Sequence, residues 1–198
     1  MASKIQKHTA QRQKAQVLAL VLVGAGLLVL GVLLTLFMPR SLEAANGEAE
    51  SQPGQVVPAE VNYPAPELSL YDLNGQPVAL SDYQDQVVLV NNWATWCPPC
   101  RAEMPTLQAY FDEHQGQGFT IVAIESGETK TEVAEFVRVN KLSFPVWLDM
   151  RQEALQAFRN FGLPSSYVID REGQIRLAWT GAISREMLEQ YVTPLLEE

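Results

Sequence analysis

The chain has 198 residues and two cysteines, both in the segment Trp96-Cys97-Pro98-Pro99-Cys100. Two thiols at this spacing can bind zinc, form a structural disulfide or exchange reversibly between dithiol and disulfide. Zinc requires four ligands, and the only imidazoles that could join the thiols are those of His8 and His114. A structural disulfide across so short a loop restricts the unfolded chain very little. The pattern therefore favours redox exchange, and we predict neither a metal nor a cofactor.

The two cysteines are expected at the beginning of a helix. They follow the apolar run Val87–Asn92, and the helical pattern after them extends to about His114, with Pro105 interrupting it. Unpaired N–H groups and the helix dipole favour an anion at such an end, so Cys97 should form a nucleophilic thiolate. Cys97 would attack a disulfide of another protein. Cys100, one turn later and more buried, would resolve the mixed disulfide.

The two prolines between the cysteines limit how far this thiolate is stabilised. Both fit the first turn of a helix, where N–H groups have no partner in any case. Neither proline can donate a hydrogen bond to Cys97, so the nearest local donors are the amides of Cys100 and Arg101. We expect moderate stabilisation, which suits a reductant better than a strong oxidant.

The rest of the region after residue 66 alternates between strand and helix patterns. A hairpin is predicted around Asn74-Gly75, and the final helix should be capped by Ser184. Strands are predicted at 68–71, 77–80, 87–92, 119–125, 144–148, 166–170 and 174–180, and helices at 97–114, 131–141, 153–161 and 184–196. This order predicts an α/β fold, in which helices flank a central mixed sheet that carries an N-terminal β-hairpin extension.

Several segments resemble one known family. Asn92-Trp93-Ala94-Thr95-Trp96-Cys97 and Cys100-Arg101-Ala102-Glu103-Met104-Pro105 are similar to the membrane-tethered TlpA/ResA-like thiol-disulfide oxidoreductases of the thioredoxin superfamily. Phe144-Pro145-Val146 and the segment 162–170 extend the resemblance, which covers about residues 64–196. The resemblance implies a thioredoxin-like fold and a thiol-disulfide oxidoreductase of the protein-disulfide reductase type.

The resemblance also implies roles for individual residues. Cys97 and Cys100 match the redox-active pair, and Pro164 matches the cis-proline that faces it. Leu163 would then offer its backbone groups to an extended peptide of the substrate. Glu103 matches the acidic residue that tunes the cysteine acidities and aids proton transfer. The alternatives are a trans proline at position 164 and a solvated Glu103.

Four further residues are expected near this site. Asn91 stands where soluble thioredoxins carry a buried Asp, so Glu103 is the expected replacement for that proton acceptor. Trp93 and Trp96 should shield the site and form part of the substrate-binding surface, although Trp93 is equally compatible with the core. Glu125 closes a predicted central strand, where a charge is costly, and is a further candidate.

The charge of the chain is distributed unevenly. Residues 1–40 contain five basic residues and no acidic ones, whereas residues 41–198 contain nine basic and 23 acidic residues. Between these regions, Val17–Met38 is a run of 22 uncharged residues, about 33 Å long as a helix, which matches the hydrocarbon core of a bilayer. We predict a transmembrane anchor, with a cleaved signal peptide as the alternative.

The charges on either side predict the topology. Residues 1–16 should be a basic cytoplasmic N-terminus and residues 17–38 the single span of a cell-membrane protein. Residues 39–66 contain five prolines and little periodicity, which is typical of a flexible linker. Residues 67–198 should then form the thioredoxin-like domain outside the cytoplasm.

The expected partners follow from this topology and from the resemblance. Substrates would be disulfides of exported proteins, with apocytochrome c before haem attachment as the leading case in cytochrome c biogenesis. With no third cysteine, electrons must come from a separate protein, and the resemblance implies a membrane protein that transfers reducing equivalents. The acidic balance argues against nucleic acid. The alternatives are an oxidase or isomerase, a peroxidase and a non-enzymatic binding module. The chain lacks the Thr-x-x-Cys motif that a peroxidase of this kind would need.

Overall fold

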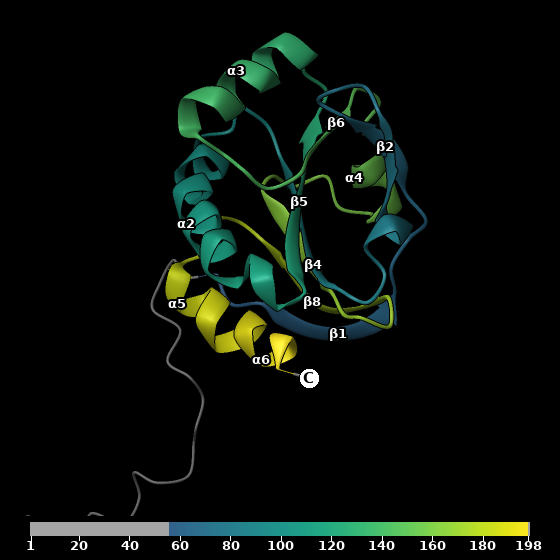
Figure 1. Cartoon of the computed structure of the whole chain (residues 1–198), viewed down its shortest axis with the longest axis vertical. Helices are drawn as coiled ribbons and strands as arrows, with labels where there is room; N and C mark the ends of the chain where they lie inside the picture. Colours follow the sequence, from purple (N-terminus) through teal and green to yellow (C-terminus); the bar gives the residue numbers. More distant parts are fainter. Residues whose placement is uncertain (1–55, 198) are drawn as a thin grey trace, which may run out of the picture. The chain divides into compact units, whose positions relative to one another are not determined.

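The computed structural model describes residues 56–197, in which eight strands form one mixed sheet in the order β1-β8-β7-β4-β5-β6-β2-β3 (Figure 1). The strands are β1 (Ala59–Pro64), β2 (Ser69–Asp72), β3 (Pro77–Ala79), β4 (Val87–Trp93), β5 (Phe119–Ser126), β6 (Val146–Asp149), β7 (Ser165–Ile169) and β8 (Gln174–Thr180). Strands β4, β5 and β6 are parallel, and β7 runs antiparallel to β4. This confirms the predicted α/β architecture.

Helices cover both faces of this sheet (Figure 1). They are α2 (Pro98–His114), α3 (Lys130–Asn140), α4 (Glu153–Ala157), α5 (Arg185–Met187) and α6 (Thr193–Leu196), with a π-helical turn at Leu188–Val192 and 3₁₀ turns at Leu80–Tyr83 and Gln115–Gln117. Helices α2, α3, α5 and α6 lie on one side of the sheet and α4 on the other. The layers match the thioredoxin-like arrangement that the sequence predicts.

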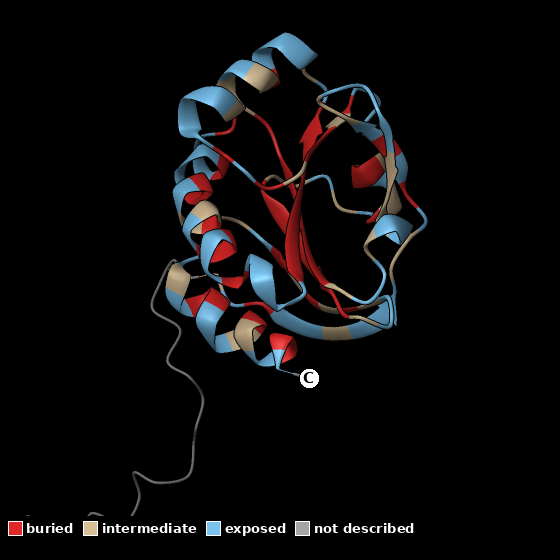
Figure 2. Ribbon diagram, viewed as in Figure 1, coloured by how far each residue is buried: buried red, intermediate tan, exposed pale blue. Residues whose placement is uncertain are grey.

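Burial follows from the apolar runs of the central strands. Every residue of β4 and β5 is buried, as expected for strands that are covered on both faces (Figure 2). Alternate residues face opposite layers: Leu89 and Ile121 belong to the cluster beneath α2, whereas Val90 and Val122 belong to the cluster on the other face. The carboxyl end of β4 is followed closely by the start of α2, since only residues 94–97 separate the two elements.

The hairpin predicted around Asn74-Gly75 is confirmed. Strands β2 and β3 pair there, and Gly75 adopts a φ of 80° that disfavours other residues. The Asp72 carboxylate accepts hydrogen bonds from the backbone N–H groups of Asn74 and Gln76, each at 2.8 Å. The hairpin extends the sheet through the pairing of β2 with β6.

The predicted linker ends too late at residue 66. Residues Ala59–Pro64 form β1, which pairs antiparallel with β8 at the edge of the sheet. Pro58 and Pro64 made the segment look like a tether, but proline is tolerated at the ends of an edge strand because one side forms no ladder. The folded domain therefore begins before residue 67.

Two helix predictions also need correction. Helix α2 continues through Pro105 for 17 residues without interruption. Helix α4 ends at Ala157, so the predicted apolar face stops at Phe158, and Phe161 is 69% exposed. The 3.6-residue spacing placed Phe161 on that face, but the helix ends before the spacing can apply.

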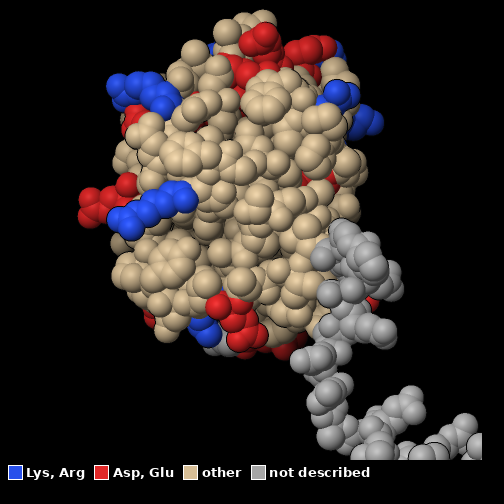
Figure 3. All heavy atoms as spheres, turned by 180° about the vertical axis from the view of Figure 1, so that it is seen from behind, with Lys and Arg blue, Asp and Glu red and all other residues tan. Residues whose placement is uncertain are grey.

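The predicted cytoplasmic segment and the membrane span at residues 17–38 lie outside the described residues. Among residues 56–197, no helix combines the length and the apolar character needed to cross a membrane. The face of the domain shown in Figure 3 carries few charged side chains near its centre, and the acidic and basic side chains gather toward its margins.

Candidate active site

Cys97 and Cys100 form a disulfide at the N-terminus of α2. Cys97 is the N-cap residue, and its Sγ accepts a hydrogen bond from the Cys100 N–H at 3.3 Å. Pro98 and Pro99 occupy the first two helical positions, as predicted. Cys97 is 3% exposed and Cys100 is fully buried, so Cys97 is the more accessible residue of the two.

Glu103 is buried one helical turn beyond Cys100, which excludes the solvated alternative. Its Oε1 accepts a hydrogen bond from Asn91 Nδ2 at 2.9 Å, and its Oε2 accepts one from the Ile183 N–H at 3.1 Å. Burial raises the pKa of this carboxyl from 4.5 to about 7, although the two hydrogen bonds oppose that shift. A group that titrates near neutral pH can both take up and release a proton there.

The peptide bond between Leu163 and Pro164 is cis, as the resemblance implies. Pro164 directly precedes β7. Because Asn92 pairs with Ser165, Pro164 lies at the same end of the sheet as the carboxyl end of β4, from which the chain continues into α2. The backbone groups of Leu163 form no hydrogen bond with any other residue between 56 and 197. They are therefore available to an extended segment of another chain.

The two tryptophans before the disulfide have different environments. Trp96, next to Cys97, is 64% exposed. Trp93 is fully buried, and its ring packs against Phe136 of α3 at 4.9 Å between centroids. Trp96 can contact a substrate, whereas the prediction of Trp93 as part of the substrate-binding surface is wrong because α3 covers it.

Sequence reasoning named Glu125 only as a candidate and missed Glu128 and Thr95. Glu125 is fully buried at the end of β5, and it contacts Glu128, whose carboxylate binds Thr95 just ahead of the disulfide. The available signal was an acidic residue near the end of a continuous apolar strand, with a glycine two positions later. Glu128 and Thr95 are 33 residues apart in the chain, and no local sequence pattern reveals a contact over that separation.

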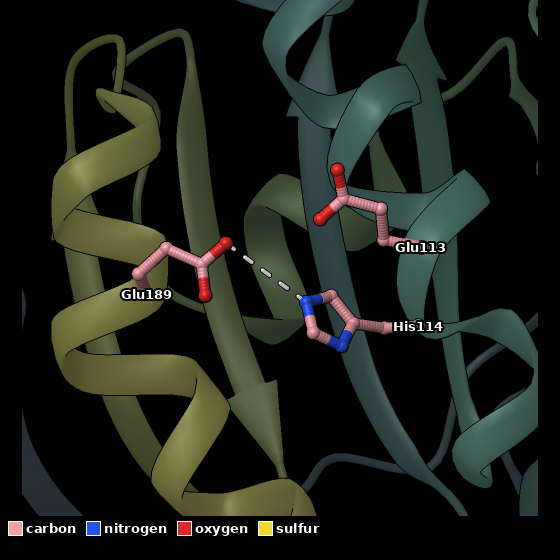
Figure 4. Close-up of side chains that lie close together, drawn as sticks. All are labelled: Glu113, His114 and Glu189. Carbon is pink, nitrogen blue, oxygen red and sulfur yellow. Dashed lines mark ion pairs between the residues drawn. The ribbon is translucent and has the colours of Figure 1, made fainter.

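The zinc alternative is not supported by the position of His114. Helix α2 separates this residue from Cys97 by 17 positions, or roughly 25 Å at 1.5 Å per residue. Instead, His114 lies beside Glu113 and Glu189 at the far end of α2, with its Nε2 4.0 Å from Glu189 Oε1 (Figure 4). Arg185 already forms ion pairs with both carboxylates, so we assign no metal to this cluster.

Comparisons with known proteins agree with this site. The chain is 35% identical over 128 residues to thiol-disulfide oxidoreductase ResA of Geobacillus kaustophilus, covering 65% of this chain and 74% of that protein. It is also 35% identical over 128 residues to ResA of Bacillus subtilis, covering 65% and 72%. Both relatives span the region that contains the disulfide.

Solved structures show the same fold. A thioredoxin family thiol:disulfide interchange protein from Chlorobium tepidum matches with a TM-score of 0.63 and 28% identity, covering 70% of this chain and 99% of that one. A secreted thiol-disulfide isomerase from Corynebacterium glutamicum matches with a TM-score of 0.67 at 23% identity, covering 74% and 96%. The second match supports the fold alone.

The profile of the AhpC/TSA family matches residues 61–178, from β1 to β8. This range contains the disulfide, the buried Glu103 and the cis-proline, and it agrees with the redox chemistry that the helix N-terminus supports. The chain therefore belongs to the AhpC/TSA family of thioredoxin-like proteins and is a thiol-disulfide oxidoreductase similar to ResA.

Proposed function

We propose that this oxidoreductase works as a reductase, anchored in the cell membrane by residues 17–38 with its N-terminus in the cytoplasm and its catalytic domain outside. Its substrates are disulfides of exported proteins, with apocytochrome c before haem attachment as the first candidate. A separate membrane protein supplies the electrons. The uncharged run and the asymmetric flanking charges support this topology.

The observation that carries the direction of electron flow is the surroundings of Cys97 Sγ. One backbone donor of the helix N-terminus, the Cys100 N–H, reaches this sulfur. Pro98 and Pro99 supply none, since proline has no N–H. A moderately stabilised thiolate is a good nucleophile, and its dithiol remains a good reductant. A strongly stabilised thiolate instead stabilises the reduced form, so that the disulfide becomes a strong oxidant.

Reduction then proceeds in two exchanges. The Cys97 thiolate attacks one sulfur of the substrate disulfide, forming a mixed disulfide and releasing the other sulfur as a thiolate, which takes a proton. Cys100 loses its proton, attacks Cys97 Sγ and releases the second substrate thiolate. Glu103, buried one turn beyond Cys100, can hold that proton at neutral pH. The substrate gains two electrons and two protons, and Cys97–Cys100 becomes the disulfide.

Trp96 is expected to contribute to substrate docking rather than to the exchange itself. Its ring is exposed beside Cys97, and it forms no part of the buried core. Trp96→Ala should raise KM for a protein disulfide by roughly 3- to 10-fold, as loss of an aromatic contact at an interface does, with little change in kcat. Steady-state reduction of insulin by the full chain in detergent would measure both. A fall in kcat at unchanged KM would contradict a docking role.

The substrate can be identified by trapping. Cys100→Ser leaves Cys97 able to attack but removes the thiol that resolves the mixed disulfide, so covalent adducts should accumulate in the membrane fraction. Mass spectrometry of adducts cleaved by a reductant identifies the partners and the attacking sulfur. The matched control is the Cys97→Ser, Cys100→Ser double variant, which should form none. Adducts absent from Cys100→Ser but present in Cys97→Ser would overturn the assigned roles.

The reduction potential tests the direction. Equilibration of the full chain in detergent with glutathione redox buffers should give a potential nearer that of thioredoxin, about −270 mV, than that of a strong oxidase, about −120 mV. A value close to the latter, with insulin left unreduced, would replace the reductase by an oxidase or isomerase. Consumption of peroxide without a partner would establish peroxidase activity instead.

A further inference from the structure

Glu125 is a buried acidic residue that the exchange mechanism does not use. It is fully buried near the end of β5, opposite Trp93 of the neighbouring parallel strand β4. Both its carboxyl oxygens accept a hydrogen bond from the Glu128 N–H, at 3.0 and 3.1 Å. Gly127, with a φ of 97°, gives the intervening loop the turn that this contact needs. Glu125 thus fixes the backbone of Glu128.

Glu128 passes this constraint to the segment ahead of the disulfide. Its carboxylate accepts a hydrogen bond from the Thr95 N–H at 2.6 Å and a short one from the Thr95 hydroxyl. Thr95 lies inside the turn that the Cys97 N–H closes on Ala94 O at 3.2 Å. The chain of contacts therefore runs from the end of β5 to the backbone that carries the attacking cysteine.

We infer that Glu125 is a positioning residue for the dithiol: it fixes Glu128, and the Glu128 carboxylate holds the turn from Ala94 to Cys97 in place. This inference deepens the proposed function, because it rests on Cys97 as the attacking thiol. It does not depend on the direction of electron flow. A thiolate gains from the helix N-terminus only while this turn keeps the sulfur aligned with the N–H groups of α2.

The charges around Glu125 make this device sensitive to pH. The charged groups that act on it are Glu128, from the loop after β5, and Asp149, from the end of β6, and both are acidic. Burial is the largest cause, and together with these neighbours it raises the pKa of Glu125 to about 8. Glu125 is therefore protonated at neutral pH. Above pH 8 it adds a second negative charge next to the carboxylate that holds Thr95.

The test follows Cys97 without any partner protein. In the full chain carrying Cys100→Ser, in detergent, the rate of alkylation of Cys97 by iodoacetamide is measured from pH 5 to pH 10. Glu125→Leu removes the acceptor and should lower this rate at pH 7 by roughly 10-fold, because a misplaced reacting group is costly. Glu125→Gln resembles the protonated residue and keeps an acceptor oxygen, so it should remain within about twofold of the parent at pH 7.

The shape of the pH profile separates positioning from a merely structural role. The parent should show a second inflection near pH 8, from Glu125 itself, and Glu125→Gln should lose it. The matched control is Asp170→Asn. Like Glu125, Asp170 is a buried acidic residue whose carboxylate accepts backbone hydrogen bonds, here from the N–H groups of Glu172 and Gln174. It lies at the opposite end of β7 from Ser165 and therefore far from the dithiol. This control should change neither the rate nor the inflection.

Three outcomes would overturn the inference: an unchanged alkylation rate in Glu125→Leu, an equal loss in Asp170→Asn, or a second inflection that persists in Glu125→Gln. If Glu125→Leu does not fold, Glu128→Ala breaks the same path at its other end, because it removes the carboxylate that accepts both hydrogen bonds from Thr95. It should lower the rate several-fold, and an unchanged rate would count against the inference. Because alkylation needs neither a substrate nor an electron donor, these failures are distinct from failure of the reductase proposal.

Discussion

Cys97→Ser is expected to abolish disulfide reduction, with a loss in kcat/KM of about 1000-fold or more, since the remaining thiol, Cys100, is fully buried and cannot attack the substrate in its place. Cys97 is the more accessible cysteine, it caps α2, and the Cys100 N–H donates a hydrogen bond to its sulfur. Turbidity from insulin reduction, with dithiothreitol as electron source and the background rate subtracted, measures the loss in the full chain.

The same assay distinguishes an enzyme from a binding module. Cys100→Ser should also lose turnover, but its product is a trapped adduct, whereas Cys97→Ser should form no adduct at all. Trp96→Ala, which leaves both sulfurs in place, is the control for loss of docking alone. If Cys97→Ser retains its biological function in cells, thiol exchange is not what the protein contributes, and the non-enzymatic alternative gains support.

Glu103→Gln is expected to change both stability and rate in a pH-dependent way. The pKa of Glu103 rises from 4.5 in the unfolded chain to about 7 in the folded one. The folded state therefore binds the proton more tightly, and stability is lost as the pH rises from about 4.5 to beyond 7. Glutamine does not titrate, so Glu103→Gln lacks this loss. The free energy of unfolding of the variant, relative to that of the parent, should therefore increase by on the order of 3 kcal/mol between pH 4 and pH 8.

Urea unfolding of the full chain in detergent, followed by tryptophan fluorescence at pH 4, 6 and 8, measures this difference. Asp112→Asn changes an exposed carboxylate of the same helix and is the matched control, for which no such pH trend is expected. The second effect is kinetic: loss of the buried proton acceptor should slow resolution of the mixed disulfide roughly 100-fold at pH 7.5. A parallel pH trend in Asp112→Asn, or unchanged resolution in Glu103→Gln, would contradict this role.

The sequence predicted the elements whose pattern is local. The apolar runs became β4 and β5, and the cysteine pair with its prolines became the first turn of α2. Strand β1 was missed because five of its six residues are exposed and its pairing with β8 spans more than a hundred residues. An edge strand of this kind carries no apolar alternation that could reveal it.

The site was predictable as far as a motif reaches. Cys97, Cys100 and Pro164 were identified by their neighbours in the chain, and the burial of Glu103 follows from its place on the inner side of α2. Whether Trp93 faces a substrate or the core depended on Phe136 of α3, 43 residues away. The contact between Glu128 and Thr95 depended on the parallel pairing of β4 with β5 and on one loop.

The Asn91 side chain bears on how Glu103 takes up and releases its proton. Its Nδ2 donates to Glu103 and to Ser166, while its Oδ1 has no hydrogen-bond partner within the described residues. An amide can present a donor to a carboxylate and, after a half-turn, an acceptor to a carboxylic acid. A buried aspartate at this position would instead repel the ionised Glu103. The side chain of Asn91 therefore carries a hydrogen-bonding group suited to each protonation state of Glu103, which an aspartate would not.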